Sequence, residues 1–357
     1  MPIHNAVGRK GEGANILDSR REPGLPAGKQ LDEILGLKLG QEVNDLVAQS
    51  LISPLEEFLA RPGKKIRGQL VELGYGLAGA QGWQEPSKKA APCLAKASAA
   101  LEAIHAGSLV VDDIQDGSQI RRGAPTFHRQ HGVPSAINAG NWLYFWPLEG
   151  IRSWGLEPER ELKLYQICAQ ALLRAHFGQA LDLGVRIDSL PQSRIPSVCL
   201  ASLELKTGAL TALGMTIGAV LGGANDERLA GLRDFGSRFG VTLQMFDDLG
   251  NLRARPGDPK RYEDLRLGRP SWVWAAVAEL ASPEEFHAFA EATRALPDET
   301  ALTRLLEGNR WVDEARRRAC AHLDLNSREL ERQWGVNFEK GVALFRELSE
   351  RLAKAYG

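Results

Sequence analysis

Two aspartate-rich clusters lie inside strongly apolar stretches of this chain, Asp-Asp-Ile-Gln-Asp at residues 112–116 and Asp-Asp-Leu-Gly-Asn at residues 247–251. The apolar context predicts helices, on which residues i, i+1 and i+4 stay close to one face. Carboxylates gathered on one face repel each other and are costly to bury unless a hard cation lies between them. Mg²⁺ takes oxygen ligands, keeps several waters and bridges carboxylates to phosphates. Two such clusters facing each other would therefore hold a diphosphate and metal ions between helices.

A single cluster of this kind also occurs on solvated helix faces. Two clusters that both follow apolar runs and both precede basic residues are much harder to obtain on a solvated face. The sequence therefore predicts metal ligands at Asp112, Asp113, Asp116, Asp247 and Asp248. Asn251 cannot supply a carboxylate, so metal binding at the second cluster depends on its two aspartates.

Basic residues flank the first cluster on both sides. Arg121 and Arg122 follow it, and the guanidinium fork matches phosphate oxygens. Gly123 and Pro125 are expected to turn the chain so that both arginines point back at the carboxylates. Upstream, Gly63 followed by three cations within four residues suits a second anion site at a helix start, although its lysines alone would also fit a solvated turn.

A third basic position is Lys206, late in an apolar helical run and followed by Thr207 and Gly208. Such a lysine either extends along the surface to reach water or points inward as a phosphate ligand. The sequence leaves both interpretations open.

Together these motifs resemble the trans-isoprenyl diphosphate synthases. The likeness extends from about residue 60 to about residue 275. Within it, the stretch from residue 111 to residue 145 is most similar to geranylgeranyl diphosphate synthases of eukaryotic type. The motifs that carry the resemblance are Gly63-Lys64-Lys65-Ile66-Arg67, the first aspartate cluster, Arg121-Arg122-Gly123, Gly178-Gln179-Ala180-Leu181-Asp182, Lys206-Thr207-Gly208 and Gln244-Met245-Phe246-Asp247-Asp248.

The resemblance implies an enzyme that joins an allylic diphosphate to isopentenyl diphosphate with Mg²⁺, three ions in all, and that forms a homodimer. The five aspartates and Lys206 would be its catalytic residues. The residues implied for isopentenyl diphosphate are Lys64, Arg67, His105 and Arg122, and those for the allylic diphosphate are Arg121, Lys206 and Lys260, with Thr207 and Gln244 beside them. His105 has an alternative as a core histidine with a satisfied hydrogen bond.

Two positions depart from the family pattern. Gly68 stands where a proline is common. A Glu-Gly-Lys sequence after the second cluster is replaced by Leu267-Gly268-Arg269, followed by Pro270, which keeps a cation and alters the backbone after it.

Product length is expected to depend on residues one turn before the first cluster and on the next helix. Gly107 and Ser108 are small, which leaves room for a chain of twenty carbons where shorter-product relatives commonly have an aromatic residue. The floor is expected from an aromatic group, with Trp142 and Phe145 as the chosen candidates beside Tyr144 and Trp146. The alternative for this group is ordinary core packing.

Helical spacing dominates the chain from Leu31 onward, and strand patterns are scarce. The sequence therefore predicts an all-α bundle around a deep central cavity, with a flexible tail at 1–28 and one catalytic domain at 29–357. The expected helices are residues 41–60, 65–80, 87–116, 136–153, 158–183, 196–221, 227–251 and 327–356.

Composition narrows the function further. The charge balance, 44 basic against 45 acidic side chains, argues against a nucleic-acid surface and against a polybasic membrane patch. The four cysteines are widely spaced, as expected of small buried residues in a reducing compartment, which predicts a cytoplasmic protein. No apolar run approaches the ~20 residues of a membrane span, so none is predicted.

Three other functions remain open at this point. A class I terpene cyclase shares the ionisation chemistry but makes no use of an isopentenyl diphosphate site. A regulatory subunit would be expected to lose carboxylates, and the first cluster keeps all three. A prenyltransferase with an unusual acceptor is the hardest alternative to exclude.

Overall fold

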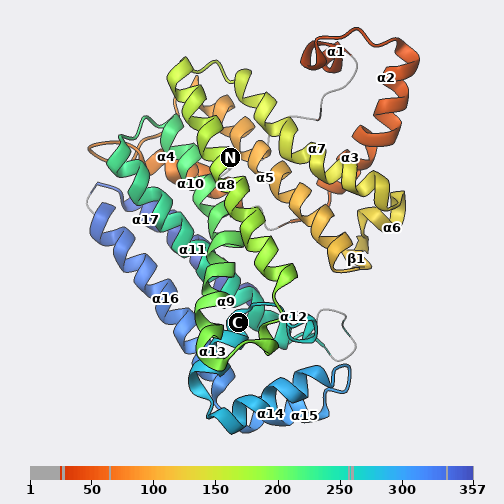
Figure 1. Ribbon diagram of the computed structural model, residues 1–357. Helices are drawn as coiled ribbons and strands as arrows, with labels where there is room; N and C mark the ends of the chain where they lie inside the picture. Colours follow the sequence, from red (N-terminus) through yellow and green to blue (C-terminus); the bar gives the residue numbers. More distant parts are fainter. Residues whose placement is uncertain are drawn as a thin grey trace, which may run out of the picture.

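Helices form nearly all of the described structure, which confirms the all-α prediction (Figure 1). The structure, a computed structural model, describes residues 25, 29–63, 66–255, 258, 261–334 and 337–356. The predicted tail at 1–28 lies outside the described residues except for Leu25. The larger helices are α4 (Ile66–Leu77), α5 (Ala90–Gln115), α7 (Val133–Arg152), α8 (Pro158–Gly184), α10 (Ala209–Leu221), α11 (Asp226–Leu252), α16 (Trp311–Trp334) and α17 (Glu339–Tyr356).

The shorter elements connect and cover this frame. They are α1 (Lys29–Leu35), α2 (Gln41–Val47), η1 (Ala48–Ile52), α3 (Ser53–Leu59), α6 (Phe127–His131), η2 (Ile187–Ser189), η3 (Gln192–Arg194), α9 (Ile195–Leu203), η4 (Glu204–Gly208), α12 (Glu263–Leu267), α13 (Trp272–Leu280), α14 (Pro283–Arg294) and α15 (Thr300–Gly308). Here η1 and η4 are single π-helical turns. A short antiparallel pair, β1 (Ile120–Arg121) and β2 (Ala124–Pro125), follows α5.

Helix α10 lies at the centre of the fold. Every one of its residues from Ala209 to Val220 is buried, and it packs against α4, α5, α8 and α11. A helix that is apolar on all sides is stable only when neighbours surround it, because burial of apolar surface drives its formation. The surrounding helices α5, α8 and α11 carry the predicted motifs and run side by side with it (Figure 1).

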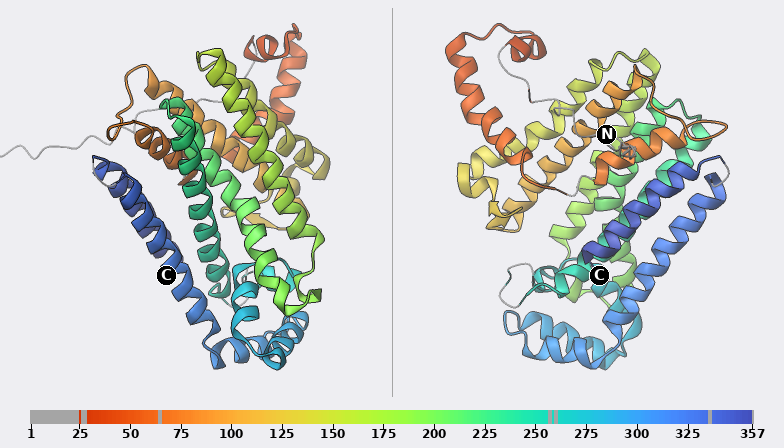
Figure 2. Two further views of the ribbon diagram at one scale, coloured as in Figure 1. Left: turned by 60° about the vertical axis from the view of Figure 1, so that its left-hand side comes forward. Right: turned by 180° about the vertical axis from the view of Figure 1, so that it is seen from behind.

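The remaining helices cover the outside of this centre. α16 and α17 lie side by side and pack against α11, while α14 and α15 lie at the end of the molecule opposite α1 and α2 (Figure 2). The largest apolar cluster joins α11, α13 and α16, with Trp274 and Phe289 fully buried within it.

Most of the expected long helices are present, with ends shifted by a few residues. The single helix expected at 327–356 is wrong, because two helices occupy this region. α16 ends at Trp334 and α17 begins at Glu339, and Asn337 between them adopts a left-handed φ of 69° that no α-helix contains. The stretch expected at 41–60 is α2, η1 and α3, one continuous run of helical backbone with a wider turn in the middle.

Two described helical stretches, Ala90–Gln115 and Gln192–Leu221, are long and apolar enough by composition to cross a membrane. Within their most apolar windows, 44% and 67% of the residues are buried in the fold. Core helices of soluble proteins pass the same test, so this composition is explained by packing around α10.

Candidate active site

A cavity of about 740 Å³ lies among α4, α5, α7, α8, η4 and α11. Its wall includes most of the residues that the sequence singled out, although they come from elements far apart in the chain. The predicted residues that line it are Arg67, His105, Ser108, Asp112, Asp116, Arg121, Arg122, Lys206, Thr207, Gln244 and Asp247. Lys64 and Lys260 lie outside the described residues.

The carboxylates at one end of the cavity are held by two cations. Lys206, on the π turn η4, places Nζ 2.9 Å from Asp182 Oδ2 and 3.4 Å from Asp112 Oδ1. Arg269, on the turn between α12 and α13, donates to Asp182 and to Asp116. Of the two interpretations of Lys206, the structure therefore places the ammonium inward.

Charge and burial shift the pKa values of the two cavity-facing carboxyls of the first cluster in opposite directions. Burial alone would raise the pKa of Asp112, but Lys206, a hydrogen bond from Gln179 (3.0 Å) and Arg121 together hold it below its ordinary value. Burial and the neighbouring Asp112 raise the pKa of Asp116 to about 7, despite Arg269. A carboxyl with a pKa this high gains stability in its charged form when a further cation approaches.

Asp113 does not share this face. Each residue turns 100° about a helix axis, so the residue after Asp112 points to another side of α5. Asp113 is fully buried, and its Oδ1 accepts from Arg121 Nε at 2.8 Å and Nη2 at 2.5 Å. The expectation of three carboxylates on one face is thus wrong for this residue, which instead holds Arg121 at the cavity wall.

The second cluster shows the same division. Asp247 lines the cavity, whereas Asp248 is buried beneath it. Asp248 accepts from Gln244 Nε2 at 2.8 Å and from the backbone nitrogen of Trp272 at 2.6 Å. Gln244 Oε1 in turn accepts from Thr207 Oγ1 at 2.6 Å, so this amide links η4 to α11. Asp248 is therefore placed to orient the site rather than to face it.

The cavity residues missing from the predicted set include Gln179, Asp182, Asp264 and Arg269. The first two belong to the motif at 178–182, which gave a usable signal. Gly178 in that motif lets α8 approach η4, since a Cβ there would lie 2.5 Å from the backbone nitrogen of Lys206. Asp264 on α12 accepts from Asn251 Nδ2 at 3.1 Å, and no regular spacing connects these two positions.

A second basic group, formed by Arg67, His105 and Arg122, also lines the cavity. The guanidinium of Arg122 lies 3.0 Å from where a Cβ on Gly63 would stand, so it does not point back at the aspartates as the sequence predicted. Burial and the nearby arginines 67, 122 and 121 hold the pKa of His105 well below its usual range. Its Nδ1 is buried with no hydrogen-bond partner among the described residues, unlike a satisfied core histidine.

The candidate chain-length residues divide between the cavity and the packing around it. Ser108 lines the cavity, but Gly107 faces α7, where an added Cβ would lie 2.8 Å from the carbonyl oxygen of Gly140. Trp142 stacks on Trp146 with ring centroids 5.7 Å apart and lies outside the cavity wall. Phe145 is 69% exposed on the outer surface.

Neither Trp142 nor Phe145 therefore forms the cavity floor, because the 100° turn per residue directs a different member of the aromatic group inward. That member is Tyr144, whose ring meets His176 of α8 edge-on at 5.5 Å. Burial raises the pKa of Tyr144 to about 12, so its hydroxyl stays protonated.

The donor set fits Mg²⁺ bound together with a phosphate ligand. Within the described ranges, no group of three His, Cys, Asp or Glu side chains is arranged to hold an ion unaided. Mg²⁺ ordinarily binds one or two carboxylates and completes its shell with water and substrate phosphate, so such a group is not required. Asp112, Asp116 and Asp247 supply cavity-facing carboxylates of this kind.

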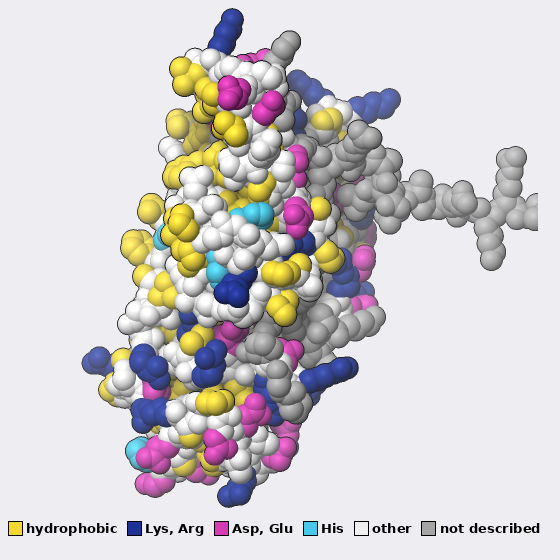
Figure 3. Space-filling model, turned by 90° about the vertical axis from the view of Figure 1, so that its right-hand side faces the viewer, with side chains coloured by type: hydrophobic (Ala, Val, Ile, Leu, Met, Phe, Trp, Pro, Cys, Tyr) yellow, Lys and Arg dark blue, Asp and Glu magenta, His cyan; other side chains and the backbone are white. Residues whose placement is uncertain are grey.

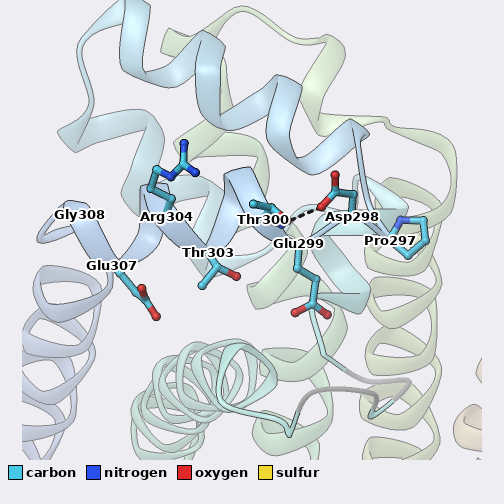
Figure 4. Close-up of a pocket in the computed structure, with 8 residues that line it drawn as sticks. All are labelled: Pro297, Asp298, Glu299, Thr300, Thr303, Arg304, Glu307 and Gly308. Atoms are coloured by element: carbon cyan, nitrogen blue, oxygen red, sulfur yellow. Dashed lines mark hydrogen bonds between the residues drawn. The ribbon is translucent and has the colours of Figure 1, made fainter.

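A separate depression lies at α15 and the loop that precedes it, and it opens broadly to solvent (Figure 4). It is lined by residues 297–300, 303, 304, 307 and 308, and its one drawn hydrogen bond runs from the Thr300 nitrogen to Asp298 (3.0 Å). None of the predicted site residues that the structure describes lines it.

One cavity of this helical fold is thus lined by both carboxylates and cationic side chains. The family model described as Polyprenyl synthetase matches residues 48–307 of this chain. The chain therefore belongs to the polyprenyl synthetase family. This confirms the resemblance noted in the sequence.

Curated relatives support the same assignment. The chain is 32% identical over 230 residues to a geranylgeranyl diphosphate synthase of Sulfolobus acidocaldarius, covering 62% of this chain and 65% of that protein. It is 30% identical over 253 residues to a short chain isoprenyl diphosphate synthase of Methanothermobacter thermautotrophicus, covering 70% of each. The chain thus spans just under two thirds of the length of the first of these relatives.

Solved structures share the fold. A geranylgeranyl pyrophosphate synthetase from Pyrococcus horikoshii superposes with a TM-score of 0.70 at 24% identity, covering 91% of this chain and 93% of that one. A geranylgeranyl pyrophosphate synthase from Corynebacterium glutamicum, solved with isoprenyl diphosphate and magnesium, gives 0.71 at 23% identity, covering 87% and 92%.

Proposed function

We propose that this protein is a Mg²⁺-dependent isoprenyl diphosphate synthase. It joins an allylic diphosphate head-to-tail to isopentenyl diphosphate and releases an all-trans prenyl diphosphate of about twenty carbons, the product class named for its Sulfolobus relative. One observation carries the proposal: a single cavity is lined by two cationic groups, Lys206 with Arg269, which pair with the aspartates, and Arg67 with Arg122. Two anion sites in one cavity suit two diphosphate substrates.

The residues of the chain divide the work of the reaction. Asp112, Asp116 and Asp247 would hold Mg²⁺, three ions in our proposal, and the ions would neutralise the diphosphate charge. Lys206 and Arg121 stabilise the negative charge on the departing pyrophosphate. The carbon–oxygen bond breaks, the double bond of isopentenyl diphosphate forms the new carbon–carbon bond, and one proton leaves to the released pyrophosphate. The apolar part of the cavity keeps water from the allylic cation.

Diphosphate release distinguishes this function from its alternatives. With Mg²⁺ and farnesyl diphosphate, we expect release to require isopentenyl diphosphate and to match its consumption one for one. Release without isopentenyl diphosphate would indicate a terpene cyclase, release that depends on another acceptor would indicate the unusual prenyltransferase, and no release would indicate a regulatory subunit. We retain a cytoplasmic location, no membrane span and no nucleic-acid partner as predictions.

Product length should depend on the residues that face the cavity. Ser108→Phe should shorten the product, because the ring would fill the space one turn below Asp112. Tyr144→Ala should lengthen it, since Tyr144 closes the cavity against His176. Chromatography of the dephosphorylated products measures both changes.

Phe145→Ala is the matched control for this test. Phe145 is an aromatic residue on the same helix that does not line the cavity and is 69% exposed, so its removal should leave the product length unchanged even where it weakens the dimer contact proposed below. An unchanged product with Ser108→Phe would contradict a chain path past this position. A fifteen-carbon product from the unaltered protein would place the floor above Tyr144.

We also propose a homodimer formed through α7 and α8. These neighbouring helices expose Ile137 (47%), Phe145 (69%), Leu173 (62%) and Phe177 (63%), and hydrophobic side chains gather along the same side of the molecule at the left of Figure 3. Contiguous exposed apolar surface of this kind is typical of a protein interface. A second copy is the occupant we propose, because an isologous contact lets one apolar patch cover its own equivalent.

Phe177→Glu should convert the dimer to monomers, because it would bury an unpaired charge at the contact. Light scattering coupled to size exclusion measures the mass. Leu325→Glu is the control, since Leu325 is 57% exposed on α16, away from this face. A monomeric unaltered protein, or a Phe177→Glu dimer, would contradict this interface.

A further inference from the structure

We propose that Arg294 and Asp188, which lie outside the cavity, are positioning residues that set the Gly268–Arg269 turn and thereby aim the Arg269 guanidinium at the diphosphate. This inference rests on the proposed function, because it assigns a diphosphate as the ligand of Arg269. It concerns the cluster of Arg186, Asp188 and Arg294, which no motif of the sequence singled out.

Arg269 reaches the cavity from a turn rather than from a helix. Its side chain enters the cavity from the turn between α12 and α13 and donates to Asp116 of α5 and Asp182 of α8. Its backbone nitrogen donates to the Asp264 oxygen at 2.9 Å, which ends α12. A guanidinium that bridges two helices from a turn depends on the path of that turn, because the turn sets where the side chain starts.

The outer side of the turn is held by the segment that follows α8. Ile187 donates its backbone N–H to the Gly268 oxygen at 2.8 Å. Gly268 has a left-handed φ of 63°, which glycine adopts without strain. A Cβ at Gly268 would lie 3.1 Å from Asp188 Oδ1 and 3.2 Å from Arg186 Nη2, so the turn rests directly on this ion cluster.

The cluster is well connected. Asp188 has a side chain 4% exposed, and it accepts from Arg186 Nε and Nη2, each at 3.1 Å. Arg294, the last residue of α14, donates Nε to Asp188 Oδ2 at 2.8 Å and Nη2 to the Asp188 carbonyl oxygen at 2.6 Å. Arg294 thus fixes both the side chain and the backbone of Asp188.

One short segment therefore holds Arg269 from two sides. Asp182 at its start binds the guanidinium, and Ile187 near its end binds the backbone of the residue before it. Buried ion pairs add little net stability compared with apolar packing, but their directional hydrogen bonds fix orientation. An ion cluster placed behind a cavity-facing arginine is accordingly suited to positioning it.

Calorimetry of inorganic diphosphate binding in the presence of Mg²⁺ tests this inference. Arg294 is 48% exposed on its side chain, so Arg294→Gln should fold, whereas Asp188→Asn would remove the buried charge that both arginines share. Arg294→Gln should weaken diphosphate binding about tenfold. The Arg269 guanidinium would be displaced rather than removed, so the loss should be smaller than for Arg269→Gln. Arg294→Lys, which keeps one donor and the charge, should restore part of the affinity.

Two further measurements separate positioning from general destabilisation. In an Arg269→Gln background, Arg294→Gln should have no further effect on diphosphate affinity, because it acts through Arg269. The KM for isopentenyl diphosphate should stay unchanged, since the proposed site for that substrate is formed by Arg67 and Arg122 and not by Arg269. Arg304→Gln is the control, an arginine of α15 drawn in Figure 4 that lines the outer depression.

The outcomes are distinct. Failure of the unaltered protein to bind diphosphate would overturn the proposed function and this inference with it. Normal binding by the unaltered protein with equal affinity in Arg294→Gln would overturn this inference alone. Full additivity of Arg294→Gln and Arg269→Gln would also overturn it, because Arg294 would then act elsewhere.

Discussion

Replacing Asp112 by alanine is expected to lower Mg²⁺-dependent turnover by about a thousandfold or more, because a metal–diphosphate site contributes several kcal/mol to the transition state. Asp112 faces the cavity, where its carboxylate pairs with Lys206 and accepts a hydrogen bond from Gln179. The helical fold should remain, since Lys206 keeps its ion pair with Asp182. Steady-state product formation measures the loss, and circular dichroism measures the fold.

Two companion variants make this result specific. Asp113→Ala should also inactivate, but through Arg121, which would lose its buried carboxylate partner. Asp234→Ala is the control, since Asp234 is 55% exposed on α11 and pairs only with the neighbouring Arg233 in the described structure. Turnover near the unaltered level in Asp112→Ala would contradict the metal assignment.

Removal of the Arg122 side chain is expected to raise the KM for isopentenyl diphosphate by about ten- to 150-fold, the equivalent of about 1.5–3 kcal/mol for one charge-assisted contact. The KM for the allylic substrate should change little, because the Arg122 guanidinium lies beside Gly63 and the Arg61 carbonyl oxygen rather than beside the aspartates. Initial rates with each substrate varied in turn measure the two constants.

The choice of variant matters at this position. Arg122 has a left-handed φ of 53°, which alanine adopts poorly and asparagine tolerates better. Arg122→Asn is therefore the companion to Arg122→Ala, and Arg129→Ala on the exposed side of α6 is the control. Equal dependence on isopentenyl diphosphate in all three proteins would favour a cyclase or another acceptor.

Periodicity predicted most of the longer helices and missed α13, α14 and α15. Trp272 to Ala278 of α13 are buried on all sides, so no alternation of polar and apolar residues marks this helix. The apparent helix at 327–356 joined two helices whose patterns continue across their junction. A break of this kind depends on backbone conformation, here near Asn337, and not on residue periodicity.

The sequence located the acidic clusters but assigned all their carboxylates to one role. Asp113 and Asp248 are each one residue from a cavity-facing partner, and each accepts hydrogen bonds below the surface. Asp113 Oδ1 accepts from Arg121, and Asp248 accepts from Gln244 and the Trp272 nitrogen. Which member of such a pair faces the cavity depends on the neighbouring helices. The same dependence selected Tyr144 rather than Phe145.

Partners that meet only through tertiary structure could not be predicted from spacing. Asp182 lies on α8 and Arg269 on the turn after α12, yet the two form an ion pair. Arg269 also pairs with Asp116 of the first cluster. No local pattern relates positions 87 residues apart. The cluster of Arg186, Asp188 and Arg294 could not be predicted from the sequence, for the same reason.

Product identification with radiolabelled isopentenyl diphosphate, farnesyl diphosphate and Mg²⁺ tests the proposed reaction most directly. We expect the label in a single prenyl diphosphate of twenty carbons, one label per molecule, with no product when Mg²⁺ is chelated. Conversion of farnesyl diphosphate to an unlabelled hydrocarbon or alcohol, with isopentenyl diphosphate left unconsumed, would contradict chain elongation.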